Sequence, residues 1–220
     1  AAALNSLSDL SFQGLDDWEA KRVLLQRAIC LQELGRYGEA LAGFQVVKPD
    51  ESPIPDYLAY WIGECFEGLG KVDSATAYFA QVVDMEPMSL LRDGAALQAA
   101  DLAMTAGQPE EAAEHFEALL GRSEREVSAL SGLIEALQAQ GDSIGVRSMR
   151  IRLIRDYPSR SVSMAALRSL EPFESPAEKF YAGVAYAENK QFTNATRLFK
   201  QLVSGPEEIQ WTGRAQYELG

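Results

Sequence analysis

The sequence predicts an all-α protein, a solenoid of antiparallel helical hairpins. Glycine recurs at Gly35, Gly70, Gly107 and Gly141, with separations of 35, 37 and 34 residues. On both sides of each glycine, apolar residues recur every three to four positions, which places them on one face of a helix. A glycine between two such helices supplies the left-handed backbone that ends the first one. One hairpin cannot bury its own apolar face, so successive hairpins are expected to stack.

The second helix of each hairpin repeats a pair of residues, one small and one large. The small residue lies five positions after the glycine and lets the two helices approach closely. The aromatic residue lies four positions further on and fills the space between them. The pairs are Ala40 and Phe44, Ala75 and Phe79, Ala112 and Phe116, then Val146 and Arg150, and in a fifth hairpin, with Lys190 at the glycine position, Ala195 and Phe199. The fourth hairpin departs from the pattern, because Arg150 replaces the aromatic ring.

This pattern resembles the tetratricopeptide repeat (TPR). In that family the eighth residue of a repeat is small, as at Ala28, Gly63 and Ala100. The twentieth residue is alanine and the twenty-fourth is aromatic, which is the pair described above. The resemblance implies a right-handed superhelical solenoid of about five repeats plus a partial terminal helix. The repeats are expected at residues 21–54, 56–89, 93–126, 127–160 and 176–209.

Three segments lie outside these repeats. Residues 1–20 are an N-terminal segment, with leucines at helical spacing from Leu4 to Leu15. Residues 161–175 separate repeats one to four, at 21–160, from repeat five. We expect a short helix in this connector, ending before Pro172, and an interruption of the stacking. Residues 207–220 are expected to form a partial further helix, and its Trp211 and Tyr217 lead us to expect that the protein continues beyond Gly220.

The charge of the chain limits its partners. The net charge is −12. Residues 1–126 hold 9 Lys/Arg and 22 Asp/Glu, whereas residues 127–220 hold 11 Lys/Arg and 10 Asp/Glu. An acidic first half repels nucleic acid and anionic membranes and favours a cationic partner. No apolar run reaches the roughly 18 residues that a membrane span needs.

The sequence contains no pattern that indicates catalysis, a cofactor or a metal, and we predict a protein that is not an enzyme. His115 is the single histidine, and Cys30 and Cys65 do not have zinc-site spacing. We expect the two cysteines to be buried free thiols. Four arginines, at 147, 150, 152 and 155, follow one another in the second helix of repeat four. They indicate salt bridges within the protein, a docking surface or, as an alternative, a phosphate-binding face.

The resemblance also implies a binding groove. In TPR proteins the second, fifth, ninth and twelfth residues of the first helix of each repeat face a concave groove. Transferred to this sequence, the predicted partner-binding residues are Tyr57, Tyr60, Glu64, Glu67, Leu97, Asp101, Met104, Glu135 and Gln138. The ninth position reads Glu64, Asp101 and Glu135, which predicts a row of carboxylates. This row indicates a basic or polyhydroxylated ligand, or else a solvated acidic surface.

Three segments, at residues 56–83, 106–120 and 154–161, further resemble bacterial envelope TPR proteins, including the helical N-terminal regions of soluble lytic transglycosylases. This resemblance implies the periplasm or cell envelope, and the cytoplasm stays open. Our first interpretation is a non-catalytic scaffold or adaptor that binds a protein or peptide in the groove. The alternative is the helical scaffold domain of a peptidoglycan lytic transglycosylase or another envelope-assembly protein, whose catalytic part is absent from this chain. Self-association through the open ends is a third possibility.

Overall fold

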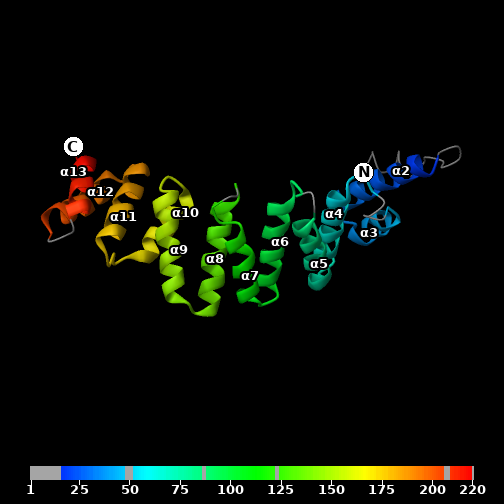
Figure 1. Cartoon of the computed structure of the whole chain (residues 1–220), viewed down its shortest axis with the longest axis horizontal. Coiled ribbons are helices and arrows are strands. Elements are labelled where there is room, and N and C mark those ends of the chain that lie inside the picture. The colour runs from blue at the N-terminus through cyan, green and yellow to red at the C-terminus, as the bar shows by residue number, and fades with distance from the viewer. Residues whose placement is uncertain (1–15, 48–51, 86–87, 122–123, 206–208, 220) are drawn as a thin grey trace. The chain divides into compact units, whose positions relative to one another are not determined.

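The computed structural model describes residues 16–47, 52–85, 88–121, 124–205 and 209–219, and within these ranges every regular element is a helix. The chain divides into two compact units, residues 1–119 (unit 1) and 120–220 (unit 2). Unit 1 contains α2 (Asp17–Glu33), α3 (Tyr37–Val46), α4 (Pro55–Gly68), α5 (Val72–Asp84), α6 (Arg92–Thr105) and α7 (Pro109–Ala118) (Figure 1). Unit 2 contains α8 (Glu126–Gln140), α9 (Ser143–Asp156), α10 (Ser161–Leu170), α11 (Pro176–Glu188), α12 (Phe192–Ser204) and α13 (Ile209–Leu219). The predicted all-α hairpin fold is confirmed.

The turns inside the hairpins have the backbone that the sequence pattern predicts. Gly35, Gly70, Gly107 and Gly141 have φ angles of 72°, 69°, 75° and 79°. In each turn the N–H of the residue after the glycine donates to a carbonyl five residues earlier, as from Lys71 to Phe66 at 2.9 Å. This bond satisfies a carbonyl that the end of the helix would leave without a partner. Lys190 takes the same position in repeat five with a φ of 60°.

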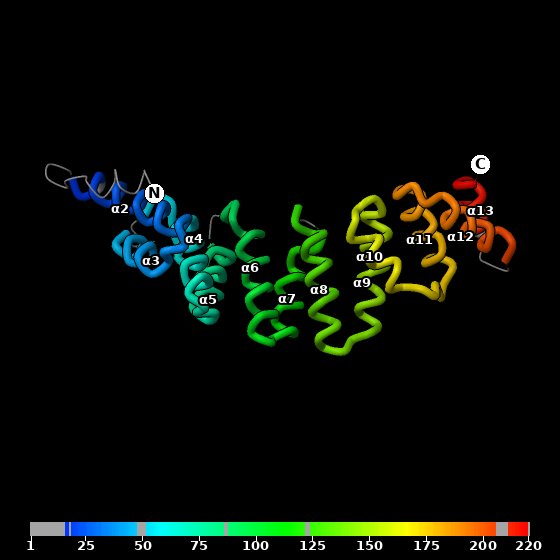
Figure 2. Tube along the Cα trace, turned by 180° about the vertical axis from the view of Figure 1, so that it is seen from behind, coloured from blue at the N-terminus to red at the C-terminus, as the bar shows by residue number. Residues whose placement is uncertain are grey.

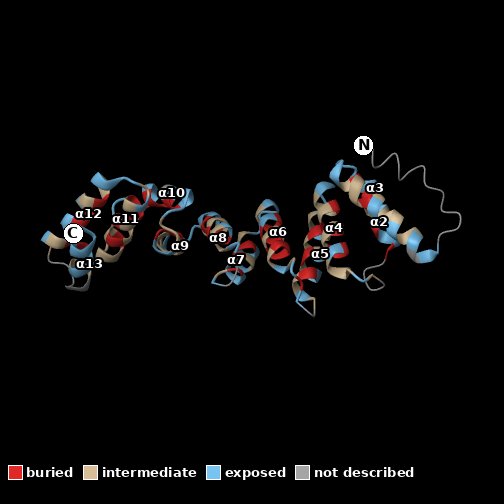
Figure 3. Ribbon diagram, turned by 90° about the horizontal axis from the view of Figure 1, so that it is seen from above, coloured by how far each residue is buried: buried red, intermediate tan, exposed pale blue. Residues whose placement is uncertain are grey.

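The aromatic residue of each regular repeat lies in the core. Phe44, Phe79, Phe116 and Phe199 are at most 2% exposed. A small residue opposite the ring makes room for it: a Cβ added to Gly63 would lie 2.9 Å from Cε1 of Phe79. In Figure 3 the buried residues of α4 and α5 lie where the two helices face each other. The small and large positions therefore act as a pair across the hairpin.

Repeat four, formed by α8 and α9, fills this space from the other helix. Ile134 stands where Gly63 stands in repeat two, and it is 8% exposed within the unit 2 core. Arg150 stands at the aromatic position and is half-buried. A branched aliphatic side chain on α8 thus supplies volume that a ring on α9 supplies elsewhere.

The connector between repeats four and five contains α10, which begins at Ser161 and ends at Leu170, before Pro172. Leu167 and Leu170 belong to the same core as α9 and α11. The hydroxyl of Ser163 is buried and donates to the carbonyl of Tyr157 at 2.6 Å. Figure 2 shows α10 beside α9, and α10 contacts both α9 and α11. Helix α11 still contacts α9 directly, so the inserted helix joins the stack of unit 2 and does not interrupt it.

Two boundaries differ from the expectation. Helix α2 begins at Asp17, inside the segment predicted as N-terminal, because Asp16 and Glu19 form a capping box there. The division between compact units falls between residues 119 and 120, not at the connector 161–175. The predicted helical spacing from Leu4 to Leu15 lies outside the described residues. At the other end, Trp211 of α13 packs against Phe180 and Tyr181 of α11, with ring centroids 5.6 and 5.7 Å apart.

Candidate functional site

The first helices of the repeats in unit 1 bring polar side chains to one place. Gln32 of α2 donates from Nε2 to Oε2 of Glu64 of α4 at 2.6 Å. Glu67 lies one turn further along α4, and Asp101 of α6 is close enough to raise its pKa through charge repulsion. Gln32, Glu64, Glu67 and Asp101 occupy the ninth and twelfth positions of their repeats, the positions that the TPR pattern assigns to the groove.

A hollow of about 610 Å³ adjoins Glu64 and Glu67. We call it the acidic groove. Its lining consists of Ile29, Gln32, Glu33, Tyr37, Trp61, Glu64, Glu67 and Gly68. The ring of Tyr37 lies against Gly68, at a place where any Cβ would collide with it. The hollow thus combines carboxylates with aromatic surface, which is the composition of a site for a cationic side chain.

The surroundings of Glu64 and Glu67 in the acidic groove disfavour the ionised form of both carboxyl groups. Burial raises the pKa of Glu64, the hydrogen bond from Gln32 opposes that rise, and the charge of Glu67 adds to it. Burial and the charge of Asp101 raise the pKa of Glu67. Each ionised carboxylate is therefore destabilised by partial desolvation and by its neighbours. A cation bound between them would relieve both effects.

The aromatic residues of the predicted site divide between groove and core. Tyr57 is exposed, and its ring centroid lies 5.7 Å from that of Trp61. Tyr60 is half-buried, with its ring edge-on to Phe79 at 5.3 Å, so it belongs largely to the hairpin core. Trp61 stacks on Phe44 at 5.7 Å and lines the acidic groove. Sequence reasoning missed Tyr37 and Trp61, because neither occupies a position that the family pattern assigns to the groove.

The remaining predicted site residues lie on three helices. Leu97 and Met104 are half-buried on α6. Glu135 is exposed on α8 and Gln138 lines a separate pocket, both in unit 2. A carboxylate row that continues from Glu64 and Asp101 to Glu135 stays a prediction, because Glu135 belongs to the other unit.

The two cysteines and the single histidine lie on helices of unit 1. Both cysteines are free; Cys65 is buried and Cys30 is half-buried. Burial, with the charge of Glu64, raises the pKa of Cys65 to about 12, so its thiol stays protonated. His115 is half-buried on α7, with Nε2 4.0 Å from Glu111 Oε1. Within the described ranges, no three His, Cys, Asp or Glu residues are grouped as metal ligands, and none of the described helices is long and apolar enough to cross a membrane.

Comparison with known proteins places this geometry in a family. Models of the tetratricopeptide repeat match residues 57–87 and 97–143. The chain contains tetratricopeptide repeats. Proteins of this family are typically non-catalytic scaffolds that bind other proteins, and no curated protein matches the sequence.

Solved structures agree on the fold. A tetratricopeptide repeat protein from Parabacteroides merdae is 14% identical, with a TM-score of 0.59 over 100% of this chain and 92% of that one. A protein from Podosopora anserina with nearly identical TPR-like repeats is 19% identical, with a TM-score of 0.50 over 86% of this chain and 96% of that one. At these identities the similarity shows the fold alone. The resemblance to envelope proteins, with the transglycosylase-scaffold interpretation and the expected location, stays a prediction.

Proposed function

We propose that this TPR protein is an interaction scaffold whose acidic groove binds a lysine- or arginine-bearing peptide segment of a partner protein. The observation that carries the proposal is the pair Glu64 and Glu67, two carboxylates of raised pKa that line a hollow with Trp61 and Tyr37. The acidic charge of residues 1–126 favours the approach of a cationic partner from a distance.

The side chains of the groove have distinct roles in this proposal. Glu64 and Glu67 accept hydrogen bonds from a lysine or arginine, and such charge-assisted bonds are the strongest in proteins. Trp61 and Tyr37 provide ring faces for the methylene stem of the same side chain or for a neighbouring apolar residue. Gln32 holds Glu64 in place through the 2.6 Å hydrogen bond. Binding of a cation lowers the pKa of both carboxylates, so it releases protons.

The test is fluorescence anisotropy with a labelled hexapeptide of alternating lysine and leucine. Replacing Glu64 and Glu67 by glutamine removes two charges and keeps the shape of the groove. We expect a loss of affinity of about tenfold or more, because charge-assisted hydrogen bonds are lost. For the unchanged protein, affinity should rise with pH as the two carboxylates ionise, and it should fall with added salt.

The matched control replaces Glu114 and Glu117 by glutamine, two exposed carboxylates of α7 that do not line the groove. This variant has the same net charge as the groove variant. Equal losses in both variants would show that the peptide responds to overall charge, and the proposal would then fail. A peptide that does not bind the unchanged protein would refute it as well.

A further inference from the structure

Helix α9 carries four arginines, and three of them have partners within unit 2. Nε and Nη2 of Arg147 bind both carboxylate oxygens of Glu178 of α11, at 3.1 and 2.5 Å. Arg152 donates to Glu126 of α8 at 2.6 Å, and Arg155 to the neighbouring Asp156 at 2.6 Å. For these three arginines, the salt bridges that the sequence indicated are present.

Arg150 is the exception. Within the described part of the chain its guanidinium makes no hydrogen bond or ion pair. It is half-buried where the other repeats bury an aromatic ring, and Ile134, at the facing small position of the repeat, lies in the core. A residue that departs from the repeat pattern, with no gain in packing to explain it, indicates a functional position.

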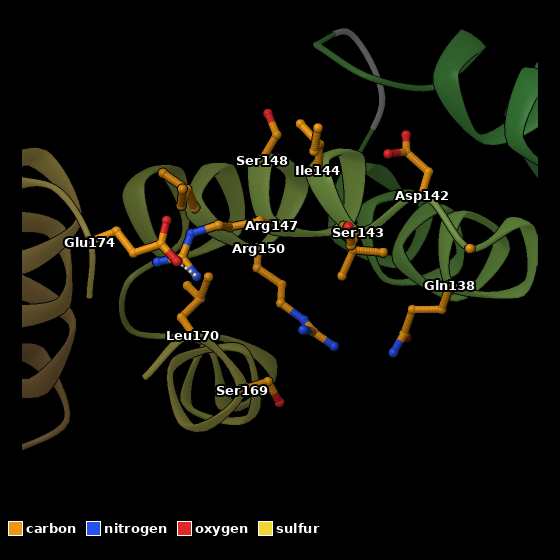
Figure 4. A pocket seen from close by; sticks show the side chains of 13 residues that line it. Gln138, Asp142, Ser143, Ile144, Arg147, Ser148, Arg150, Ser169, Leu170 and Glu174 are labelled. Carbon is orange, nitrogen blue, oxygen red and sulfur yellow. Dashed lines mark ion pairs between the residues drawn. The ribbon is translucent and has the colours of Figure 1, made fainter. Parts of the chain in front are cut away.

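A pocket of about 850 Å³ lies beside Arg150. It is formed by the end of α8, by α9, by the inserted helix α10 and by Glu174 in the segment that leads to α11. Figure 4 shows the Arg150 side chain extending from α9 toward the open space beside Gln138 and Ser169. The pocket therefore lies where the inserted helix α10 meets α9, with Arg150 in its lining.

The other charged side chains of the pocket have hydrogen-bond or ion-pair partners. The Asp142 carboxylate accepts from the backbone N–H of Gly145 at 2.9 Å, where α9 begins. Glu174 lies 3.3 Å from Arg147, which also binds Glu178. Of the charged side chains that line the pocket, Arg150 is the one that makes no hydrogen bond or ion pair within the described residues. Aliphatic surface lies beside it, since Ile144 is 83% exposed and Ile151 is half-buried.

We propose that this pocket binds a peptide segment of a partner protein in which a carboxylate side chain neighbours an aliphatic one. The planar guanidinium of Arg150 matches the two oxygens of a carboxylate. The amide of Gln138 offers a further donor at the pocket wall. Ile144 and Ile151 cover the aliphatic neighbour. The ligand has the opposite charge to the peptide proposed for the acidic groove, so the two proposals stand independently.

The test uses a fluorescein-labelled hexapeptide of alternating leucine and glutamate, titrated with the full chain and followed by anisotropy. Its counterpart with glutamine in place of glutamate has the same aliphatic surface without the charge. We expect saturable binding of the glutamate peptide, about tenfold weaker binding of the glutamine peptide, and an equal loss with Arg150→Gln. The lysine and leucine peptide of the first test should bind Arg150→Gln as it binds the unchanged protein.

Arg160→Gln is the matched control, because Arg160 is an exposed arginine of unit 2 that does not line the pocket. It should bind the glutamate peptide with unchanged affinity. Equal losses in the two variants, or no saturable binding to the unchanged protein, would overturn the proposal. Light scattering of the protein alone completes the test: a dimer that Arg150→Gln dissociates would assign the pocket to a second copy and would also overturn the partner-peptide proposal.

Discussion

Hairpins α4–α5 and α8–α9 have the same fold but fill the space between their helices in opposite ways. In the first, Gly63 on one helix makes room for the ring of Phe79 on the other. In the second, Ile134 on α8 is buried and Arg150 on α9 is left half-buried beside a pocket. Protein interiors are packed to a nearly constant density, but either helix of a hairpin can supply the side-chain volume. Repeat four uses this freedom to place a charge where the other repeats have a ring.

The largest expected effect contrasts Phe79→Ala with Arg150→Ala. Phe79 is fully buried, and removing its ring should lower the free energy of unfolding by about 3–5 kcal/mol. Arg150 makes no core contact of that kind, so its truncation should change stability by less than about 1 kcal/mol. Urea unfolding followed by circular dichroism measures both. Similar losses would show that Arg150 packs like the aromatic residues, which would remove the contrast between the hairpins.

The next prediction tests whether Ile134 supplies the side-chain volume that an aromatic ring supplies in the other repeats. Arg150→Phe alone should destabilise by about 1–3 kcal/mol, because Ile134 already occupies the space that the ring needs. Ile134→Ala alone should also destabilise, because it leaves a cavity. The double variant restores the small and large pair of repeat two, so the two effects should couple favourably by about 1–3 kcal/mol. Purely additive changes in a double-mutant cycle would show that Ile134 does not take the place of the ring.

Carboxylates of the two units should respond to pH in opposite directions. Burial alone would raise the pKa of Glu178, but hydrogen bonds from Arg147 and from the backbone N–H of Glu174 outweigh it, and the pKa is lowered from its ordinary value of 4.5. Its contribution to stability is therefore present above pH 4.5 and is lost as the pH falls through the lowered value. For Glu67 the pKa is raised, so its contribution is present below pH 4.5 and is lost as the pH rises through the raised value.

Glutamine substitutions at neutral pH should show this difference. Glu178→Gln should destabilise by about 1–2 kcal/mol, because Arg147 loses a charged partner. Glu67→Gln should stabilise by less than about 1 kcal/mol, because it removes a repelled charge. Unfolding midpoints measured from pH 3 to 8 provide the comparison. Destabilisation by both substitutions would mean that the acidic groove holds its carboxylates in favourable contacts after all.

A further small effect concerns the turns of repeats two and five. Gly70→Ala meets no atom within 4 Å, so its cost of about 1 kcal/mol comes from the left-handed backbone alone. Lys190 adopts the same conformation with a side chain, and Lys190→Gly should stabilise by a similar amount at a φ of 60°. Thermal unfolding of the two variants gives the measurement. A loss of stability with Lys190→Gly would show that the Lys190 side chain makes a contribution larger than the strain.

Much of the fold could be predicted because the same spacing of glycine, small and aromatic residues recurs in several repeats of the sequence. The glycine turns, the hairpin pairs and the short helix of the connector follow from local spacing, which a single chain displays directly. The candidate sites were harder. Gln32, Glu64 and Glu67 could be assigned to one face by repeat position, whereas Trp61 and Tyr37 occupy positions without a groove assignment, and they enter the site because of how neighbouring helices pack.

The sequence by itself determined the repeating helical hairpins, the departure at Arg150 and the acidic character of the first half. These are properties of spacing and composition, which local propensity and burial translate into structure. Tertiary structure alone decided that Ile134 compensates for the missing ring, that three of the four α9 arginines pair within unit 2, and that α10 leaves a pocket beside the fourth. Such outcomes depend on distances between residues far apart in the chain, and only the packed helices set those distances.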